Sequence, residues 1–302
     1  MSELIVYGLV LGTIIALGTI GFTLSTKIAG FCNYSHGDLM TVGAYIALLV
    51  NGTFFPAVGF LQQKIGPFSF GWGLLIAFLP AILITAGLAI LIDRWVYRPL
   101  RGLKAPSIHF DMISIGVAFA LRGVIYVAWG ADYHFYFSGI RSMLFLPLGI
   151  KLRPDEIFIM AVAWALVAAT YLFLGRTKMG KALRATADNP DLARVAGIST
   201  ERMITLTWGI VGALAAVSGI LYGIGSQLRP EMGWIFLLPL FAALVLGSIG
   251  SITGALVGGL VLGIAQQVST AWLPATYKPA VAFIVMILTL IVRPEGIFGR
   301  SR

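Results

Sequence analysis

The chain consists largely of long apolar stretches, separated by polar breaks that contain proline or glycine. A helix needs about 20 apolar residues to cross the hydrocarbon core of a bilayer. Backbone groups have no water partner in lipid, so each stretch is expected to be helical. We expect eight to ten spanning helices, because the seventh and eighth stretches are poorly separated. The expected spans are residues 4–26, 37–55, 72–93, 107–129, 155–174, 203–225, 234–249, 252–272 and 278–292.

Composition agrees with a membrane environment. Hydrophobic residues make up 59% of the chain and charged residues 11%, whereas a soluble domain carries about 25% charged residues. A soluble fold of this composition would expose large apolar patches to water. We therefore predict an all-α, polytopic transmembrane helical bundle that includes glycine-broken helices, with residues 1–302 as a single transmembrane domain.

Basic residues are unevenly distributed between the two sets of alternating breaks. One set holds 14 Lys and Arg residues and the opposite set holds 6, with Arg122 inside a span. Basic residues favour the cytoplasmic side, so the N-terminus is expected outside and the C-terminus in the cytoplasm. The net charge of +9 then reflects topology and a cytoplasmic docking surface, and no nucleic-acid partner is expected.

The longest cytoplasmic break, residues 175–202, encodes a short bounded helix. Asp188 or Asn189 can accept hydrogen bonds from the free amides of its first turn, and Pro190 suits the first helical position. Gly197 stands where a left-handed residue ends a helix. A rigid element between two spans suits docking of a partner that pushes on it, and an ordinary basic juxtamembrane loop is the alternative.

The start of this break nearly matches the phosphate-binding pattern G-x-x-x-x-G-K-[ST], from Gly175 to Ala182. Such a loop needs a Ser or Thr hydroxyl for magnesium and a preceding strand. Ala182 occupies the hydroxyl position, and a membrane helix precedes the segment. We expect no nucleotide site, no cofactor and no catalysis in this chain, so that any ATP driving it is hydrolysed by another subunit.

Polar residues cluster where the second span begins. Asn33, Ser35, His36 and Asp38 lie between apolar flanks. Polar groups at membrane depth are costly and often mark a transport pathway, and broken helices hold substrates in many transporters. A capped interfacial turn is the alternative, with Asn33 or Ser35 as the N-cap. His36 and Asp38 supply too few ligands for a metal site.

A glycine-rich stretch covers residues 246–263, where Gly250, Gly254 and Gly258 repeat every four residues. Glycines at this spacing let helix backbones approach closely. A broken helix at Ser248–Thr253 that faces the pathway is the sharper alternative. In that interpretation the candidate pathway residues are Ser248, Gly250, Ser251, Thr253 and Gly254.

Two ionisable residues, Asp111 and Arg122, share the span 107–129. Eleven residues place them on one helix face about 16 Å apart, too far for a direct pair. Three roles remain open at this point: placement near the two interfaces, where long side chains reach the headgroups, partners on other helices, or ion coupling.

Six motifs agree in order and spacing with one family over nearly the whole chain. They are Asn33–Leu39, Arg94–Arg101, Met179–Pro190, Ala196–Arg202, Leu246–Gly259 and Arg293–Gly299. The chain resembles the membrane permease subunits of ABC importers for branched-chain amino acids, the LivH-type family. The family usually has Asn-Phe-Ala-His-Gly at the first motif, where this chain has Tyr34 and Ser35 in the middle.

The resemblance implies a bacterial inner-membrane importer. A periplasmic or extracellular binding protein would deliver substrate, two related permeases would form the channel as a heterodimer, and two cytoplasmic ATPases would drive it. The family's pathway segments map onto Asn33–Asp38 and Leu246–Gly259. Its coupling loop maps onto Gly180–Gly197, with the candidate residues Gly180, Arg184, Asp188, Asn189, Pro190, Asp191, Arg194 and Gly197.

Other functions remain open at the level of sequence. Members of this family also carry urea, amides, other amino acids or aromatic acids. The rival from another class is an autonomous secondary transporter that uses Asp111 and Arg122 for ion coupling, and a non-transporting assembly subunit is a third possibility.

Overall fold

The computed structural model describes residues 1–54, 61, 63–137, 139, 141–145 and 151–299. Its elements are α1 (Ser2–Ala29), α2 (His36–Leu49), the π-helix η1 (Val50–Phe54), α4 (Trp72–Ile92), the π-helix η2 (Asp93–Tyr97), α5 (Arg98–Gly102), α6 (Ser107–Trp129), β1 (Leu144–Phe145), β2 (Lys151–Leu152), α7 (Pro154–Arg176), α8 (Lys178–Asp188), α9 (Pro190–Val195), α10 (Thr200–Gly225), α11 (Met232–Gly247), α12 (Ile252–Val268), the 3-10 helices η4 (Ser269–Ala271) and η5 (Ala275–Tyr277), and α13 (Lys278–Val292).

The predicted helical bundle is confirmed. Within the described ranges, seven helical runs are long and apolar enough to cross a membrane, and α11 is a shorter apolar helix. The expected span 37–55 is met by α2 with its continuation η1, and its last residue lies outside the described residues. Each of the nine expected spans therefore coincides with helix.

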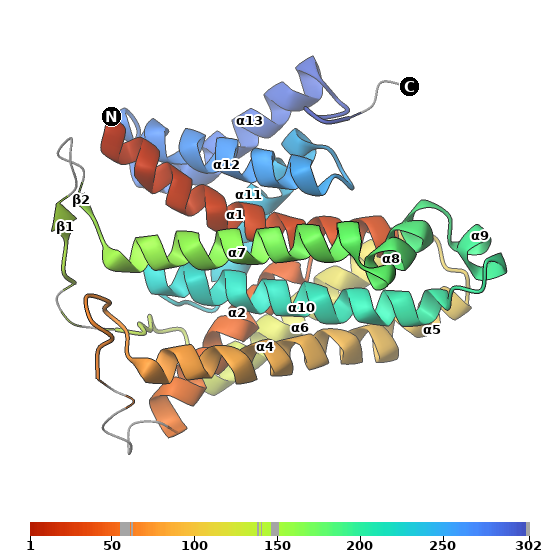
Figure 1. Cartoon of the computed structure of the whole chain (residues 1–302), viewed down its shortest axis with the longest axis horizontal. Coiled ribbons are helices and arrows are strands. Elements are labelled where there is room, and N and C mark those ends of the chain that lie inside the picture. The colour runs from red at the N-terminus through yellow and green to blue at the C-terminus, as the bar shows by residue number, and fades with distance from the viewer. Residues whose placement is uncertain (55–60, 62, 138, 140, 146–150, 300–302) are drawn as a thin grey trace.

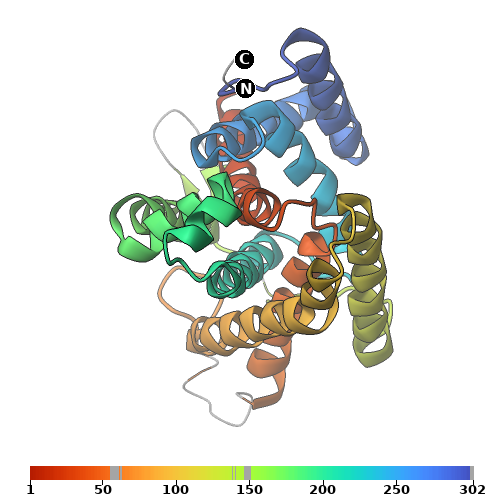
Figure 2. The ribbon, with the colours of Figure 1, turned by 90° about the vertical axis from the view of Figure 1, so that its right-hand side faces the viewer.

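Helices α1 and α10 form the centre of the bundle. The apolar window of α1 is 67% buried and that of α10 is 72% buried, against 17% for α6 and 11% for α13. The hydroxyl of Ser218 on α10 donates to the carbonyl of Ile14 on α1 at 3.2 Å. Figures 1 and 2 show α1 and α10 surrounded by the other helices, so the exposed faces of α6 and α13 are left for lipid or a partner subunit.

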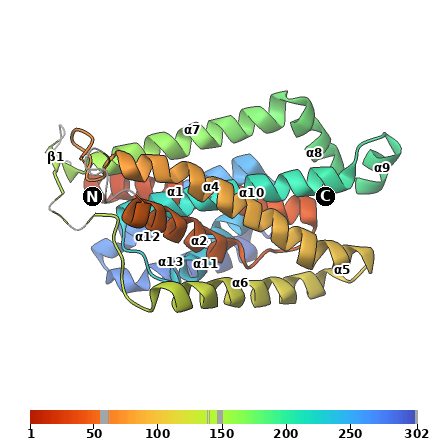
Figure 3. The same ribbon diagram turned by 90° about the horizontal axis from the view of Figure 1, so that it is seen from below.

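The two ends of the bundle differ. The N-terminus lies at the end that carries the antiparallel pair β1–β2, called here the hairpin end. The C-terminal part of the chain lies at the opposite end, which carries α5, α8 and α9 and is called here the loop end (Figures 1 and 3). This arrangement places the predicted cytoplasmic break, residues 175–202, at the end opposite the N-terminus, as the alternation of charge requires.

Glycines bring α1 and α12 into close contact. A Cβ at Gly12 would lie 2.9 Å from the Cα of Leu260, and one at Gly259 would lie 2.5 Å from the Cα of Ala16. Gly263 packs against the backbone of Gly12 in the same interface. The close packing predicted for the glycine repeat is confirmed at Gly254 and Gly258, where a Cβ would meet the backbone of Gly247 and of Ala243 on α11.

We expect the Gly259→Leu variant to lose stability by about 1–3 kcal/mol or more, because overpacking a tight interface forces backbones apart. Thermal unfolding in detergent checks this result. Gly116→Leu is the matched control, since a Cβ at this position of α6 meets nothing within 4 Å. Equal midpoints for the two variants would contradict the packing account.

Candidate transport pathway and coupling loop

The segment between α1 and α2 returns deep into the bundle. Gly30 ends α1 with a left-handed φ of 79°. His36, the first residue of α2, places its Nε2 3.0 Å from the carbonyl oxygen of Gly18. Gly18 lies eleven residues before Ala29, which is about 16 Å along the helix axis. Helix α2 therefore begins well inside the bundle, and residues 31–35 are irregular backbone that runs from the end of α1 to that depth.

Side chains of α6 satisfy the backbone of this irregular segment. The Asp111 Oδ1 accepts the amide of Cys32 at 2.9 Å, and the Ser114 Oγ accepts the amide of Tyr34 at 3.1 Å. Irregular backbone at membrane depth requires such internal partners. The structure thus gives Asp111, near the start of α6, a partner on another segment, which is one of the three roles left open by the sequence.

Arg122 is paired across helices with a residue of the polar cluster. Its Nε and Nη2 donate to the two carboxylate oxygens of Asp38 at 3.0 and 3.1 Å. The Asp38 side chain is fully buried and that of Arg122 is 12% exposed. The guanidinium also lies over the rings of Trp234 at 4.8 Å and Phe119 at 5.3 Å. This contact joins α2, α6 and α11.

All four predicted polar residues of the first segment are buried. The Asn33 Oδ1 accepts the amide of Ser35 at 3.2 Å and its hydroxyl at 2.7 Å. The Asn33 Nδ2 and the His36 Nδ1 have no hydrogen-bond partner among the described residues. Buried polar atoms without a hydrogen-bond partner are rare in folded proteins. Asn33 and His36 are therefore candidates for a functional role.

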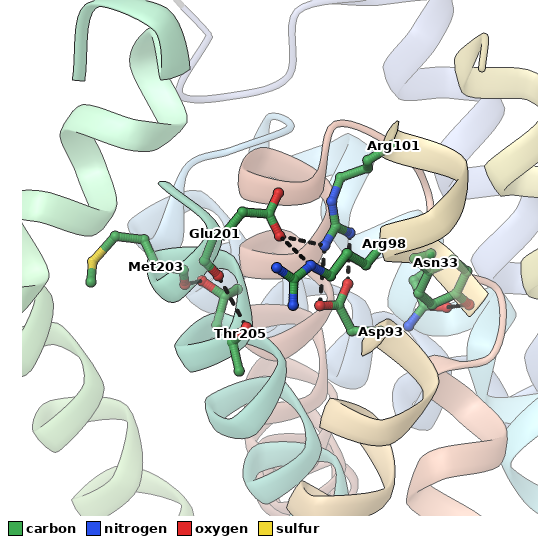
Figure 4. A network of polar contacts seen from close by, with 9 residues as sticks. Asn33, Asp93, Arg98, Arg101, Glu201, Met203 and Thr205 are labelled. Carbon is green, nitrogen blue, oxygen red and sulfur yellow. Dashed lines mark hydrogen bonds and ion pairs between the residues drawn. The ribbon is translucent and has the colours of Figure 1, made fainter. Parts of the chain in front are cut away.

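A charged network at the loop end connects the start of α10 to the end of α4 (Figure 4). Arg101 donates to both carboxylate oxygens of Asp93 at 2.6 and 3.2 Å. Arg101 and Arg98 both lie 3.4 Å from the carboxylate of Glu201, in the first turn of α10. The network therefore fixes α10 to the η2–α5 turn just after the loop that carries α9.

The same turn reaches the buried polar segment. The hydroxyl of Tyr97, at the end of η2, donates to the Asn33 Oδ1 at 3.3 Å. The Tyr97 ring stacks on Trp208 of α10, with centroids 5.0 Å apart and planes 17° apart. A chain of contacts thus runs from Glu201 through η2 to Asn33. The sequence did not reveal this chain of contacts, although Arg94–Arg101 stood out as a motif.

The predicted coupling loop folds as two helices rather than one. Asn189 is the N-cap of α9, with its Oδ1 accepting the amide of Leu192 at 3.0 Å, and Pro190 takes the first helical position. Gly197 has a φ of 81°. These three predictions are confirmed, whereas α8 was not predicted. Thr177 caps α8 by accepting the amide of Gly180 at 2.9 Å.

Some charged residues of this loop are exposed, and others contact the ends of the helices that flank it. Asp191 and Arg194 form an ion pair at 3.2 Å with exposed side chains. Asp188 lies 3.4 Å from Lys27 of α1. An Arg184 Nη2 lies 3.5 Å from the carbonyl oxygen of Gly175. The tip of α9 is therefore open for contact, while the end of α8 is attached to the bundle.

The chain breaks between α11 and α12, as the sharper interpretation of the glycine stretch predicts. Ser248 and Gly250 have positive φ values of 93° and 87°. The Ser251 Oγ caps α12 by accepting the amide of Gly254 at 3.0 Å, and it lies 3.1 Å from the hydroxyl of Thr253. The sequence analysis treated a broken helix and close helix packing as alternatives for this glycine-rich stretch. The structure shows both.

The structure does not bring the two candidate pathway segments together. A Cβ at Gly250 would lie 3.3 Å from the Lys27 side chain, whereas His36 meets α1 at Gly18, nine residues earlier and about 14 Å away along the axis. A cavity of about 230 Å³ instead gathers Gly250 and Thr253 with Lys27 and Arg184 of the coupling loop. The break between α11 and α12 is therefore a neighbour of α8.

Among the described residues, no group of three or more His, Cys, Asp or Glu side chains could hold a metal ion.

The sequence profile of the family described as "Branched-chain amino acid transport system / permease component" matches residues 4–290. The chain is 33% identical over 314 residues to the LivH permease of the high-affinity branched-chain amino acid transport system of Escherichia coli K12, covering 99% of this chain and 98% of that protein. It is 34% identical to the BraD permease of Pseudomonas aeruginosa, covering 98% and 95%. It is 28% identical to a probable LivH permease of Methanocaldococcus jannaschii, covering 96% and 90%. The chain belongs to the family of permease components of branched-chain amino acid transport systems.

Proposed function

We propose that this chain is the membrane permease subunit of an ATP-driven importer for branched-chain or other hydrophobic amino acids. Residues 1–302 form one transmembrane permease domain of the bacterial inner membrane, with no catalysis of its own. Two cytoplasmic ATPases, a second homologous permease and an external binding protein complete the assembly. The observation that carries this proposal is the chain of contacts from the coupling loop, through Glu201 and Tyr97, to buried Asn33.

The loop end is proposed to face the cytoplasm. Among the described residues, the breaks at this end hold 12 Lys and Arg residues, against 6 at the hairpin end, and basic residues favour the cytoplasmic side. In this orientation α8 and α9 meet the ATPases, and the N-terminus lies outside.

The proposed mechanism is alternating access. Closure of the ATPases pushes α9, which precedes α10 by only four residues. Movement of α10 shifts Glu201 and therefore Arg101, which is bound to Asp93 of η2. The η2 turn carries Tyr97, whose hydroxyl contacts Asn33. The push can thus reach the buried segment Asn33–Asp38, where the pathway is proposed to change its opening, with Ser248–Gly254 moving beside α8.

The ion-coupled rival is less well supported by the geometry. Asp111 accepts the amide of Cys32, and Arg122 forms a two-bond pair with Asp38. Both side chains on which that rival depends are therefore engaged in holding the broken segment. Import of urea, amides or aromatic acids by the same ATP-driven machinery is the alternative within the proposed class.

Breaking the network tests the proposal. We expect Glu201→Gln to raise the ratio of ATP hydrolysed to amino acid imported by about tenfold, since coupling between sites is typically worth 1–3 kcal/mol. Both rates are measured in proteoliposomes that contain the whole assembly. The control is Glu295→Gln, an exposed carboxylate at the same end. An unchanged ratio in both variants would contradict the proposed route.

A further inference from the structure

The cavity of about 230 Å³ lies at the loop end, where α7 turns into α8 (Figure 1). Four segments line it: the last turns of α1, the last turns of α7, helix α8 and the start of α12. Part of its wall is apolar, with Leu24, Leu174 and Ile252. Two cationic side chains, Lys27 and Arg184, also line it. The cavity therefore combines apolar surface with positive charge.

The two cations converge on one side of α8. The Lys27 ammonium lies 3.4 Å from the carboxylate of Asp188. Arg184 precedes Asp188 by four residues, so their side chains are neighbours on one face of α8. The stem of Lys27 also lies against the break before α12, because a Cβ at Gly250 would be 3.3 Å from the Lys27 Cδ. One small ligand in the cavity would therefore lie within reach of both cations.

The positive charge of the cavity is only partly matched by the protein. The side chains of Lys27 and Asp188 are 38% and 71% exposed, and an ion pair this exposed contributes little. Lys27 is therefore free to turn to another anion. Arg184 pairs with no carboxylate of the described residues, and its Nη2 lies 3.5 Å from the carbonyl oxygen of Gly175. The cavity thus offers two cations against one exposed carboxylate.

Hydrogen-bond donors without a partner lie on the same wall. The amides of Ile252 and Thr253, in the first turn of α12, have no acceptor in the described part of the chain. Free amides at the start of a helix favour an anion. The hydroxyl of Thr23, a residue that is 1% exposed and lines the cavity, also lacks a hydrogen-bond partner there. The donors and the cations come from α1, α8 and α12, so they surround the cavity.

We propose that this cavity binds a phosphate group, carried by an acidic phospholipid or free as the phosphate anion. Lys27 and Arg184 supply the positive charge, and the first turn of α12 donates hydrogen bonds. Basic pockets between membrane helices bind lipid headgroups in this way. Tyr171, which lines the cavity and is 57% exposed, suits the headgroup level of a bilayer.

A bound phosphate would join α1, α8 and the start of α12. The proposed mechanism moves α8 and the break before α12 beside each other, so the ligand would act on coupling. That effect rests on the proposed function, whereas binding to the cavity does not.

Thiol labelling tests the site without ATP hydrolysis. Ala187 of α8 lines the cavity, so Ala187→Cys in a Cys32→Ala background reports whether the cavity is filled. Ser107→Cys, exposed at the start of α6, is the control reporter outside it. The assembled transporter, freed of lipid in detergent, is treated with a maleimide. Inorganic phosphate, dihexanoyl-phosphatidylglycerol or dihexanoyl-phosphatidylcholine is present in parallel samples.

We expect phosphatidylglycerol to slow labelling at Ala187→Cys and not at Ser107→Cys. Phosphatidylcholine should protect less, because its choline group cancels the charge of its phosphate. Lys27→Met and Arg184→Gln should each raise the phosphatidylglycerol concentration needed for half protection by about tenfold, the size expected for losing one charge-assisted hydrogen bond. Lys178→Gln is the matched control on α8, exposed and outside the cavity, and should leave that concentration unchanged.

The arms of the experiment separate the two sources of phosphate. Protection by phosphatidylglycerol alone identifies a lipid headgroup as the ligand, and protection by inorganic phosphate as well identifies a soluble anion. Equal protection by the two lipids would overturn the proposal, as would protection that survives Lys27→Met combined with Arg184→Gln, or no protection at all.

ATP-driven amino acid uptake by the same assembly distinguishes failure of the site from failure of the proposed function. If uptake occurs and no ligand protects Ala187→Cys, only the phosphate site is wrong. If phosphatidylglycerol protects and no amino acid is imported, the site stands and the proposed function fails.

Discussion

Replacing Leu192 and Val195 together with Asp is expected to abolish ATP-driven uptake. The two side chains lie on α9 and are 66% and 86% exposed, which is unusual for apolar groups on a polar loop and suits a buried interface in the assembly. Substituting a central apolar residue of an interface costs about 2 kcal/mol or more of binding free energy. Replacing both residues should therefore weaken ATPase binding by roughly a thousandfold. The measurement is co-purification of the ATPases with the permease, together with uptake.

Leu103→Asp is the matched control for the α9 variant, because Leu103 is 80% exposed at the same end but follows α5 rather than lying on α9. Its assembly should retain the ATPases. The exposed pair Asp191–Arg194 should contribute little by itself, about 0–1 kcal/mol, so Asp191→Asn tests charge on α9 separately. Retention of the ATPases by the Leu192→Asp, Val195→Asp variant would remove α9 from the docking surface.

Breaking the Asp38–Arg122 pair is expected to destabilise the bundle by about 3–5 kcal/mol, because one buried charge is left without its partner. Arg122→Met removes the guanidinium and leaves Asp38, which is fully buried. Unfolding in detergent, followed by loss of helical signal, gives the change in free energy. The double variant Asp38→Leu, Arg122→Met should recover most of the loss, since it leaves no unpaired charge.

The more exposed pair between Arg98 and Glu201 supplies the comparison. Its side chains are 55% and 44% exposed, so Arg98→Gln should cost about 0–1 kcal/mol. The loss of unfolding free energy in the double variant is compared with the sum of the losses in the two single variants, Asp38→Leu and Arg122→Met. If the two values are equal, the pair is not the unit that holds α2 against α6.

The helices could be predicted from the sequence because apolar length and charge alternation are local signals. The cap at Asn189, Pro190 and the left-handed Gly197 are also local, and each is confirmed. Helix α8 was missed, since its short polar sequence resembles an ordinary loop and its helix is stabilised by packing of Gly180 against the end of α7.

Long-range pairing could not be predicted. Asp111 and Arg122 share a helix, and the sequence does not reveal that their partners are Cys32 and Asp38, about 80 residues earlier. The depth at which α2 begins depends on contact between His36 and Gly18, which no local pattern encodes. The route through Tyr97 was hidden for the same reason, because a tyrosine at a helix end is ordinary in sequence.

The most direct test of the central claim is leucine uptake into proteoliposomes, measured with and without the ATPase subunits. Our account predicts uptake that requires the ATPases and ATP, and no uptake by the purified chain alone under an ion gradient. Gradient-driven uptake by the chain alone would contradict it and would favour an autonomous secondary transporter.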